Sequence, residues 1–198
     1  MDRMPVCGIG DPSSILGEST DKYSFVLQHF YKPPFGAFPN FWYNSAMWNH
    51  PSPTKIYEAL GAVADGRILV KGNTAKCYSS SGNKYYDINY DPASKAIMSN
   101  DNSSYWTGDL GYPSIAFLLK SGVLEYRTDM GELLQGVAWK DINQKFKNDF
   151  SASLKYVLKD LDKDKRVKLQ EYVQSLLKAV KDLNLKKLGE RAVPPMGY

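Results

Sequence analysis

The chain has 198 residues, of which 43% are hydrophobic and 23% are charged, and its mean hydropathy is -0.42. A chain of this length buries roughly 70% of its unfolded surface, so its core needs no metal or disulfide. The composition excludes wholesale disorder and a membrane helix, which needs ~20 apolar residues. The net charge is +4, and the pI near 8.8 lies below the value above ~9 that is typical of a dedicated nucleic-acid-binding surface.

Residues 1–53 form a first segment that is rich in aromatic side chains and proline. Ten aromatic residues lie between positions 23 and 48, among them Trp42 and Trp48. Five prolines between positions 33 and 53 exclude a continuous helix. So much apolar area cannot remain exposed on a monomer. The segment is therefore predicted to be an arm that covers either the chain's own core or a partner, because Trp and Tyr are preferred at binding sites.

Residues 54–150 are predicted to form an α+β core domain. A helix is expected to begin near Ser52 or Thr54 and to end at Gly66, with apolar residues at helical spacing between them. Four short strand candidates follow, separated by turn residues, at positions 67–71, 74–79, 84–90 and 95–99. Because turns of a few residues can join only antiparallel neighbours, this pattern predicts a small β-meander packed on the helix.

The chain after the meander alternates polar turns with short helices. Residues 100–104 have the sequence NDNSS, which predicts a polar loop. Pro113 is expected to open a short helix that ends at Gly122. Asp129 and Glu132 form a capping pattern for another brief helix.

Residues 151–198 are predicted to form basic C-terminal helices and a tail. Asp162 is expected to cap a long helix that carries one apolar stripe. Residues 140–198 hold 14 basic and 8 acidic side chains, a net charge of +6, so the basic excess of the chain lies here. The mixture of signs favours a solvated face, but a local surplus of cations also attracts phosphate groups and acidic partners.

The loop after the meander is the best location that the sequence offers for catalysis. Asp101 and Asp109 are weak catalytic candidates, together with His50. Sites tend to lie on loops held by a rigid sheet, and two carboxylates in different surroundings can divide acid and base roles. Ordinary turn chemistry is the competing interpretation, since Asn and Asp are the commonest turn residues.

The other candidate motifs in the sequence lack the residue spacing or the context that their chemistry requires. The two cysteines and two histidines lack the short paired spacing of a zinc site, and the glycines near position 8 lack the context of a nucleotide-binding loop. We therefore predict no metal and no cofactor. Residues 1–5 lack the apolar run of a secretory signal. The sequence thus favours a reducing cytoplasm, with Cys7 and Cys77 as free thiols.

The function expected from the sequence is that of a non-enzymatic cytoplasmic protein that binds another macromolecule, RNA or a ribonucleoprotein surface. Rings that stack on bases and cations that neutralise phosphates are the physics of such binding. The alternatives are a protein assembly module that docks through the aromatic arm, and a small enzyme that uses the loop of residues 101–109. The residues expected to bind the nucleic acid or partner are Lys145, Lys147, Lys155, Lys159, Lys163, Lys165, Arg166, Lys168, Trp42 and Trp48.

Overall fold

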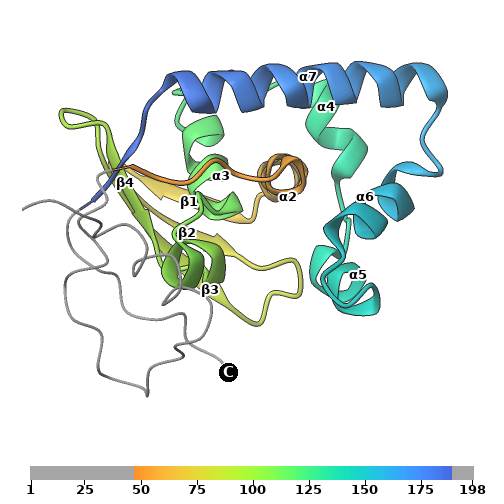
Figure 1. Ribbon diagram of the computed structural model, residues 1–198, viewed down its shortest axis with the longest axis horizontal. Helices are drawn as coiled ribbons and strands as arrows, with labels where there is room; N and C mark the ends of the chain where they lie inside the picture. Colours follow the sequence, from red (N-terminus) through yellow and green to blue (C-terminus); the bar gives the residue numbers. More distant parts are fainter. Residues whose placement is uncertain (1–46, 189–198) are drawn as a thin grey trace, which may run out of the picture. The chain divides into compact units, whose positions relative to one another are not determined.

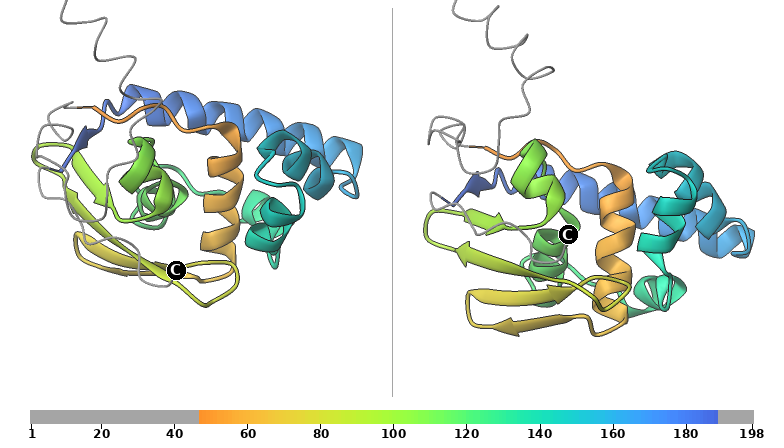
Figure 2. Two further views of the ribbon diagram at one scale, coloured as in Figure 1. Left: turned by 60° about the horizontal axis from the view of Figure 1, so that its bottom comes forward. Right: turned by 90° about the horizontal axis from the view of Figure 1, so that it is seen from below.

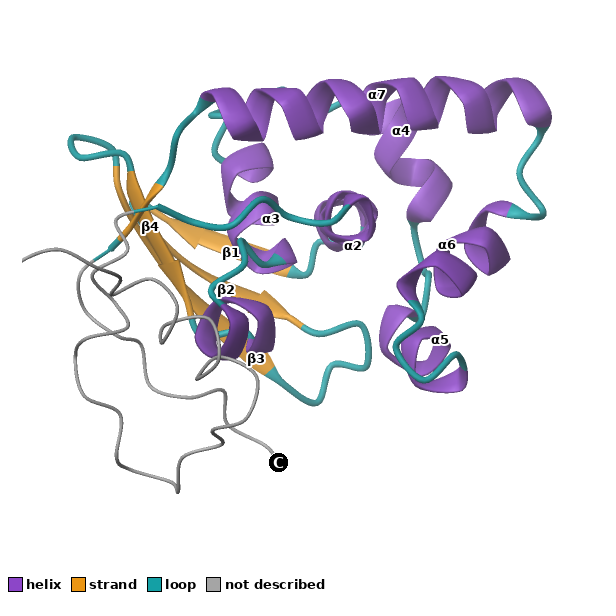
Figure 3. Cartoon of the chain, viewed as in Figure 1, coloured by secondary structure: helices purple, strands orange, loops and turns teal. Residues whose placement is uncertain are grey.

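The computed structural model describes residues 47–188 and confirms the predicted α+β class. Five strands form one sheet in the order β1-β2-β3-β4-β5. The strands are β1 (Ile68–Lys71), β2 (Thr74–Tyr78), β3 (Tyr85–Asp91), β4 (Ala96–Ser99) and β5 (Lys186–Lys187). The helical elements are α2 (Pro53–Ala64), the π-helical turn η2 (Ser103–Thr107), α3 (Tyr112–Lys120), α4 (Thr128–Gly131), η3 (Glu132–Leu134), α5 (Trp139–Lys145), α6 (Phe150–Leu158) and α7 (Lys163–Asp182). Figure 3 shows the strands gathered on one side and α5, α6 and most of α7 on the other.

Strands β1 to β4 form the predicted antiparallel meander. Burial alternates along the first part of β3, where Tyr86 and Ile88 are buried while Tyr85 and Asp87 are half-buried. The fifth strand was not predicted: β5 pairs in parallel with β4, and Lys186 lies opposite Ala96. The sheet therefore connects strands β1 to β4 with the segment that follows α7.

Helix α2 occupies the centre of the described part of the chain. It begins with Pro53 at its first turn, as the fixed φ of proline favours, and Gly66 follows its end with a φ of 65°. Ile56, Ala59 and Leu60 are completely buried. Figures 1 and 2 show why: α2 lies between the sheet with α3 on one side and α5 with α6 on the other, and α7 runs across it. A polar side chain on this helix is thus surrounded by protein.

The polar loop predicted at residues 100–104 is partly helical, and three of its residues are buried. Asn100, Asp101 and Ser104 are buried, and the chain enters η2 instead of an open loop. The amide oxygen of Asn100 accepts a hydrogen bond from the Asp87 N–H at 2.9 Å. These short polar side chains are buried because the neighbouring backbone supplies them with hydrogen bonds.

The C-terminal region is helical as predicted, with aspartates at two helix starts. The side chain of Asp149 accepts from the Ala152 N–H at the start of α6, and that of Asp162 caps α7. Between α5 and α6 the chain is interrupted at Lys147 and Asn148, both with positive φ. Within residues 47–188 no helix combines the length and the apolar character that a bilayer crossing requires. The arm of residues 1–46, the last ten residues and the division of the chain at residues 53 and 150 stay predictions.

Candidate functional site

A polar pocket lies where the start of α2, the β2–β3 turn, the segment after β4 and helix α5 meet. Its volume is about 330 Å3. Its lining is dominated by charged, amide and hydroxyl groups, with a few aromatic rings. The lining residues are Lys55, Glu58, Arg67, Ser79, Ser80, Lys84, Tyr86, Asp101, Asn102, Ser103, Tyr112, Trp139, Lys140, Asn143, Gln144 and Asn148. This volume is at the small end of the range of ligand sites, ~300–1,000 Å3.

The Asp101 carboxyl of the pocket is deeply buried, and only 4% of the residue's surface is exposed. Its Oδ1 accepts hydrogen bonds from the Ser103 N–H at 3.0 Å and the Ser104 N–H at 3.2 Å. Its Oδ2 has no hydrogen-bond partner within residues 47–188. The carboxyl lies directly against the backbone of Gly111, where a Cβ would overlap both of its oxygens. Only glycine allows this approach.

The surroundings of Asp101 favour its neutral form. Burial raises the pKa of its carboxyl above the ordinary value, and this effect exceeds the lowering by the hydrogen bonds from Ser104 and by the charge of Lys55. In the neutral form of Asp101, Oδ1 still accepts while Oδ2 carries an O–H. That form can give a proton to a group that enters the pocket.

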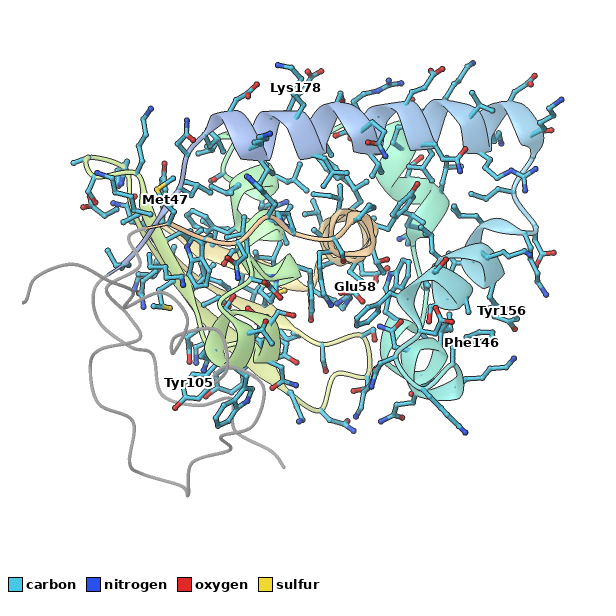
Figure 4. All side chains as sticks on the ribbon, in the orientation of Figure 1. Met47, Glu58, Tyr105, Phe146, Tyr156 and Lys178 are labelled. Carbon is cyan, nitrogen blue, oxygen red and sulfur yellow. The ribbon has the colours of Figure 1, made fainter. Side chains whose placement is uncertain are left out.

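A buried ion pair holds the second carboxyl of the pocket. The Lys55 ammonium donates to Glu58 Oε2 at 2.8 Å, and the Asn143 side-chain N–H donates to Glu58 Oε1 at 2.8 Å. Glu58 is 4% exposed, and Figure 4 shows it between α2 and α5. Because its two oxygens accept from Lys55 on α2 and from Asn143 on α5, Glu58 ties α5 to α2. The two carboxyls of the pocket thus differ in surroundings, as in sites that divide acid and base roles.

The remaining groups of this region are a fixed cation and weak acids. Arg67 donates through Nε to Asp65 at 2.9 Å and through Nη1 to the Tyr78 carbonyl at 2.9 Å, while its Nη2 has no partner in the described part of the chain. Burial raises the pKa of Tyr112 well above its usual value and that of the neighbouring Cys77 thiol to about 12. Both stay protonated at neutral pH, so neither is a ready nucleophile.

The arrangement suits acid–base chemistry on a bound polar molecule. Proton transfer is favoured when the donor lies in a site with little water and when nearby fixed charges stabilise the charge that develops. The pocket offers a proton donor, a fixed cation and an ordered ion pair. Among residues 47–188, no three His, Cys, Asp or Glu side chains gather closely enough to hold a metal ion.

Of the three catalytic candidates from the sequence, the pocket contains Asp101 and neither of the other two. Asp109 lies elsewhere on the same segment, where its carboxyl accepts from the Asn49 side chain at 3.1 Å and from the Thr107 hydroxyl at 2.7 Å. His50 is exposed and does not line the pocket. The structure thus places Asp101 in the pocket, and it places Asp109 and His50 outside it.

The basic residues expected to bind a partner lie on α5, α6, α7 and the turns between them. Seven of the eight are exposed, and Arg166 is half-buried. The ammonium groups of Lys145 and Lys159 both lie over the ring of Tyr156, at 4.3 and 4.5 Å from its centroid. The ring of Phe146 is 5.4 Å from that of Tyr156, and Figure 4 shows the two residues close together, Phe146 just after α5 and Tyr156 on α6.

The two tryptophans of the prediction have different positions. Trp48 is buried, and its indole N–H donates to the Ile97 carbonyl at 3.0 Å. Its ring therefore packs in the core and ties the segment before α2 to β4. Trp42 lies outside the described residues.

Sequence reasoning missed Glu58, Lys55, Arg67 and Asn143. One signal for Glu58 was present. Between Ile56 and Val63 it is the single charged residue among apolar ones and glycine, so a helix buried on all sides must bury this carboxyl. No comparable signal marks Arg67 or Asn143, because their places depend on tertiary packing.

A family model described as "Uncharacterised conserved protein UCP014422" matches residues 48–186. This range includes every residue of the polar pocket and the basic residues of α5 to α7. No curated protein and no solved structure matches the chain.

Proposed function

The chain belongs to the UCP014422 family, and we propose that it is a small enzyme that binds a polar small molecule in the polar pocket and transfers a proton through the Asp101 carboxyl. One observation carries this proposal. Asp101 is 4% exposed, and its Oδ2 has no partner in the described part of the chain. An unsatisfied buried group costs ~1–3 kcal/mol of stability, and such costs are typical of functional sites.

Access to Asp101 requires a local movement. Its Oδ2 and the Arg67 Nη2 are sealed from solvent, so a ligand that contacts them displaces part of the lining. The β2–β3 turn is the part best suited to move, because its tip at Gly82 and Asn83 is exposed. Closure over the ligand would then exclude water from the proton transfer.

The test is calorimetric titration of a panel of polyols, sugars and sugar phosphates into the wild-type protein, Asp101→Asn and Asp160→Asn. Asp160 is the control because its side chain is 84% exposed. We expect a panel member to bind the wild type and Asp160→Asn equally and Asp101→Asn roughly tenfold more weakly. In the infrared spectrum, the C=O band of a protonated carboxyl at neutral pH should disappear in Asp101→Asn alone. Equal binding to all three proteins would refute the proposal.

Binding of RNA or a ribonucleoprotein surface is the second candidate, and the contacts around Tyr156 favour it. Lys145 and Lys159 hold their charges over this ring, which combines a stacking surface with cations, as single-strand binding requires. Of these two lysines, Lys159 lies 3.7 Å from a carboxylate, that of Asp160, and Lys145 lies within 4 Å of none in residues 47–188. The charge of Lys145 is therefore available to phosphates, whereas Lys159 has to exchange its exposed contact with Asp160 for one with a phosphate.

This second candidate predicts salt-sensitive binding of a single-stranded RNA oligomer. The logarithm of the affinity should fall by ~0.7 per phosphate contact for each log unit of salt. The double variant Lys145→Gln, Lys159→Gln should lower that slope by ~1.4, whereas Lys178→Gln, on the far part of α7, should leave it unchanged. Fluorescence anisotropy over a salt series measures both quantities. Failure to bind at low salt, or an unchanged slope in the double variant, would exclude this candidate.

Two further parts of the sequence interpretation stand as proposals. We place the protein in the cytoplasm, and the free buried thiol of Cys77 is compatible with a reducing compartment. Docking on another protein through the aromatic arm concerns residues outside the described range.

A further inference from the structure

Three side chains of the polar pocket each carry a buried polar atom that has no hydrogen-bond partner within residues 47–188. These atoms are Asp101 Oδ2, Arg67 Nη2 and Asn143 Oδ1. Folded proteins leave few buried polar atoms unpaired, and each such atom calls for an explanation. Three of them in one pocket indicate a ligand that supplies the missing partners.

The other unpaired polar side-chain atoms in the described part of the chain have no comparable position. Those of Ser114 and Ser153 are hydroxyls within helices α3 and α6. Trp139 lines the pocket, but its Nε1 lies 3.2 Å from the place that a Cβ of Gly61 would take. The indole N–H therefore packs against α2, and we assign it no ligand contact.

Two of the three pocket atoms are fixed in place by contacts of their own side chains. Arg67 donates through Nε to Asp65 and through Nη1 to the Tyr78 carbonyl, both at 2.9 Å, which fixes the plane of the guanidinium. The Asn143 amide donates to Glu58 Oε1 at 2.8 Å, and this contact determines which end of the amide is the oxygen. Nη2 and Oδ1 are thus held in position before a ligand arrives.

The three atoms belong to one network of neighbouring groups. Asn143 contacts Glu58, which pairs with Lys55. Burial is the largest influence on the pKa of Asp101, and the charge of Lys55 also acts on it. Burial likewise raises the pKa of the Cys77 thiol, on which the charges of both Arg67 and Asp101 act. A small molecule in the pocket therefore lies within reach of all three side chains.

The hydrogen-bonding capacity of these atoms restricts the chemistry of the ligand. A guanidinium nitrogen only donates, an amide oxygen only accepts, and the Oδ2 of Asp101 donates when the carboxyl is neutral. The ligand must therefore accept and donate hydrogen bonds within a small volume. A hydroxyl group does both, since it has one O–H and two lone pairs.

Two cations of the pocket are already neutralised by carboxylates. Lys55 lies 2.8 Å from Glu58, and Arg67 lies 2.9 Å from Asp65. An anionic ligand would obtain the full countercharge of either cation only by displacing its carboxylate, which is unfavourable for a buried pair. A neutral hydroxyl adds a hydrogen bond at Arg67 Nη2 and leaves both pairs intact.

We propose that the polar pocket takes a neutral polyhydroxyl molecule, a sugar or polyol, with hydroxyl groups that accept from Arg67 Nη2, donate to Asn143 Oδ1 and meet Asp101 Oδ2. This inference rests on the proposed function and names its ligand class. The volume of about 330 Å3 lies at the small end of the range of ligand sites, so it suits a single sugar unit and not a polymer.

The first test compares matched ligands by calorimetry on the full chain. Ribose, glucose and sorbitol are the neutral members, and ribose 5-phosphate, glucose 6-phosphate and glucuronic acid are the charged counterparts. Because Lys84 and Lys140 also line the pocket, the counterparts show directly whether an anion binds better. At least one neutral member should bind, and its charged counterpart should bind more weakly. Deoxy sugars that lack one of the contacting hydroxyls should bind roughly tenfold more weakly than their parents.

The second test uses Arg67→Lys, which keeps the charge beside Asp65 but removes the donor at Nη2. This variant should bind the neutral ligand roughly tenfold more weakly. Arg127→Lys is the matched control, because Arg127 also pairs with an aspartate two positions away, Asp129, and does not line the pocket. One deoxy sugar should lose affinity for the wild type but lose nothing further in Arg67→Lys, because it lacks the hydroxyl that meets Nη2.

The inference is overturned if no neutral member binds, if the charged counterpart binds as tightly or more tightly, or if Arg67→Lys and Arg127→Lys behave alike. Should Arg67→Lys fail to fold, the deoxy series on the wild type decides, and equal binding of every deoxy sugar and its parent overturns the inference. Asp101→Asn separates the two proposals. Tighter binding of a charged ligand that Asp101→Asn weakens would refute the neutral ligand class and leave the proposed function standing.

Discussion

Replacing Asp101 by asparagine should stabilise the protein at neutral pH and remove part of its pH dependence. Burial raises the pKa of Asp101 in the folded state. Above the ordinary aspartate pKa, the folded state therefore holds a proton that the unfolded state has lost, and the free energy of unfolding falls as pH rises, by up to ~1.4 kcal/mol per pH unit. The fall stops above the folded-state pKa, where both states are ionised. Asparagine has no such proton, so Asp101→Asn should lack this slope.

Urea denaturation of the wild type and the variant at a series of pH values measures the difference directly. The lowered pKa values of Asp91, Asp129 and Asp162 act in the opposite direction, since their stabilisation is lost as pH falls. They are present in both proteins, so they cancel in the difference. Asp160→Asn should follow the wild type. Parallel curves for the wild type and Asp101→Asn would show that Asp101 is not a buried acid.

A more stable but inactive Asp101→Asn would have a clear physical meaning. Its Oδ1 can still accept from Ser103 and Ser104, while the charge that burial penalises is gone. Natural proteins retain a group that lowers their stability in this way where the group has a functional role. Gain of stability together with loss of ligand binding would thus separate a functional carboxyl from a structural one.

The sheet and the helices were predictable because their signals are local. Turn residues around Gly72 and Gly82 separate short segments of strand-forming residues, and Asp162 marks the start of α7 as an N-cap. The alternation along β3 determined which side chains are buried. Each of these features depends on neighbours within a few positions, and a sequence displays them directly.

The polar pocket was only partly predictable because it depends on long-range packing. Asp101 was a candidate, but its burial depends on the close approach of Gly111, ten residues later. Glu58 and Asn143 are 85 residues apart and share a hydrogen bond. The parallel pairing of β5 is similar, because Lys186 and Lys187 have no strand signal of their own. Seven of the eight basic residues are exposed, as a solvated face requires, and their binding stays a prediction.

Gly111→Ala should be among the most damaging single substitutions in the chain. The backbone of Gly111 has φ -75° and ψ 160°, which any residue adopts, so the effect comes from contact and not from backbone strain. A Cβ at this position would overlap both Asp101 oxygens. The carboxyl would have to leave its place and give up the hydrogen bonds from Ser103 and Ser104. We expect a loss of ~1–3 kcal/mol in the free energy of unfolding, measured by urea denaturation, together with loss of the Asp101 infrared band.

A double-mutant cycle identifies the cause of that loss. Asp101→Ala removes the carboxyl that the new methyl group would strike, so adding Gly111→Ala to this variant should cost much less than adding it to the wild type. The expected coupling energy is ~1–3 kcal/mol, the range found for residues in direct contact. An equal cost in both backgrounds would mean that Gly111 serves something other than Asp101. A large coupling would establish that glycine at this position exists to admit the buried acid, which ties the backbone after η2 to the chemistry of the pocket.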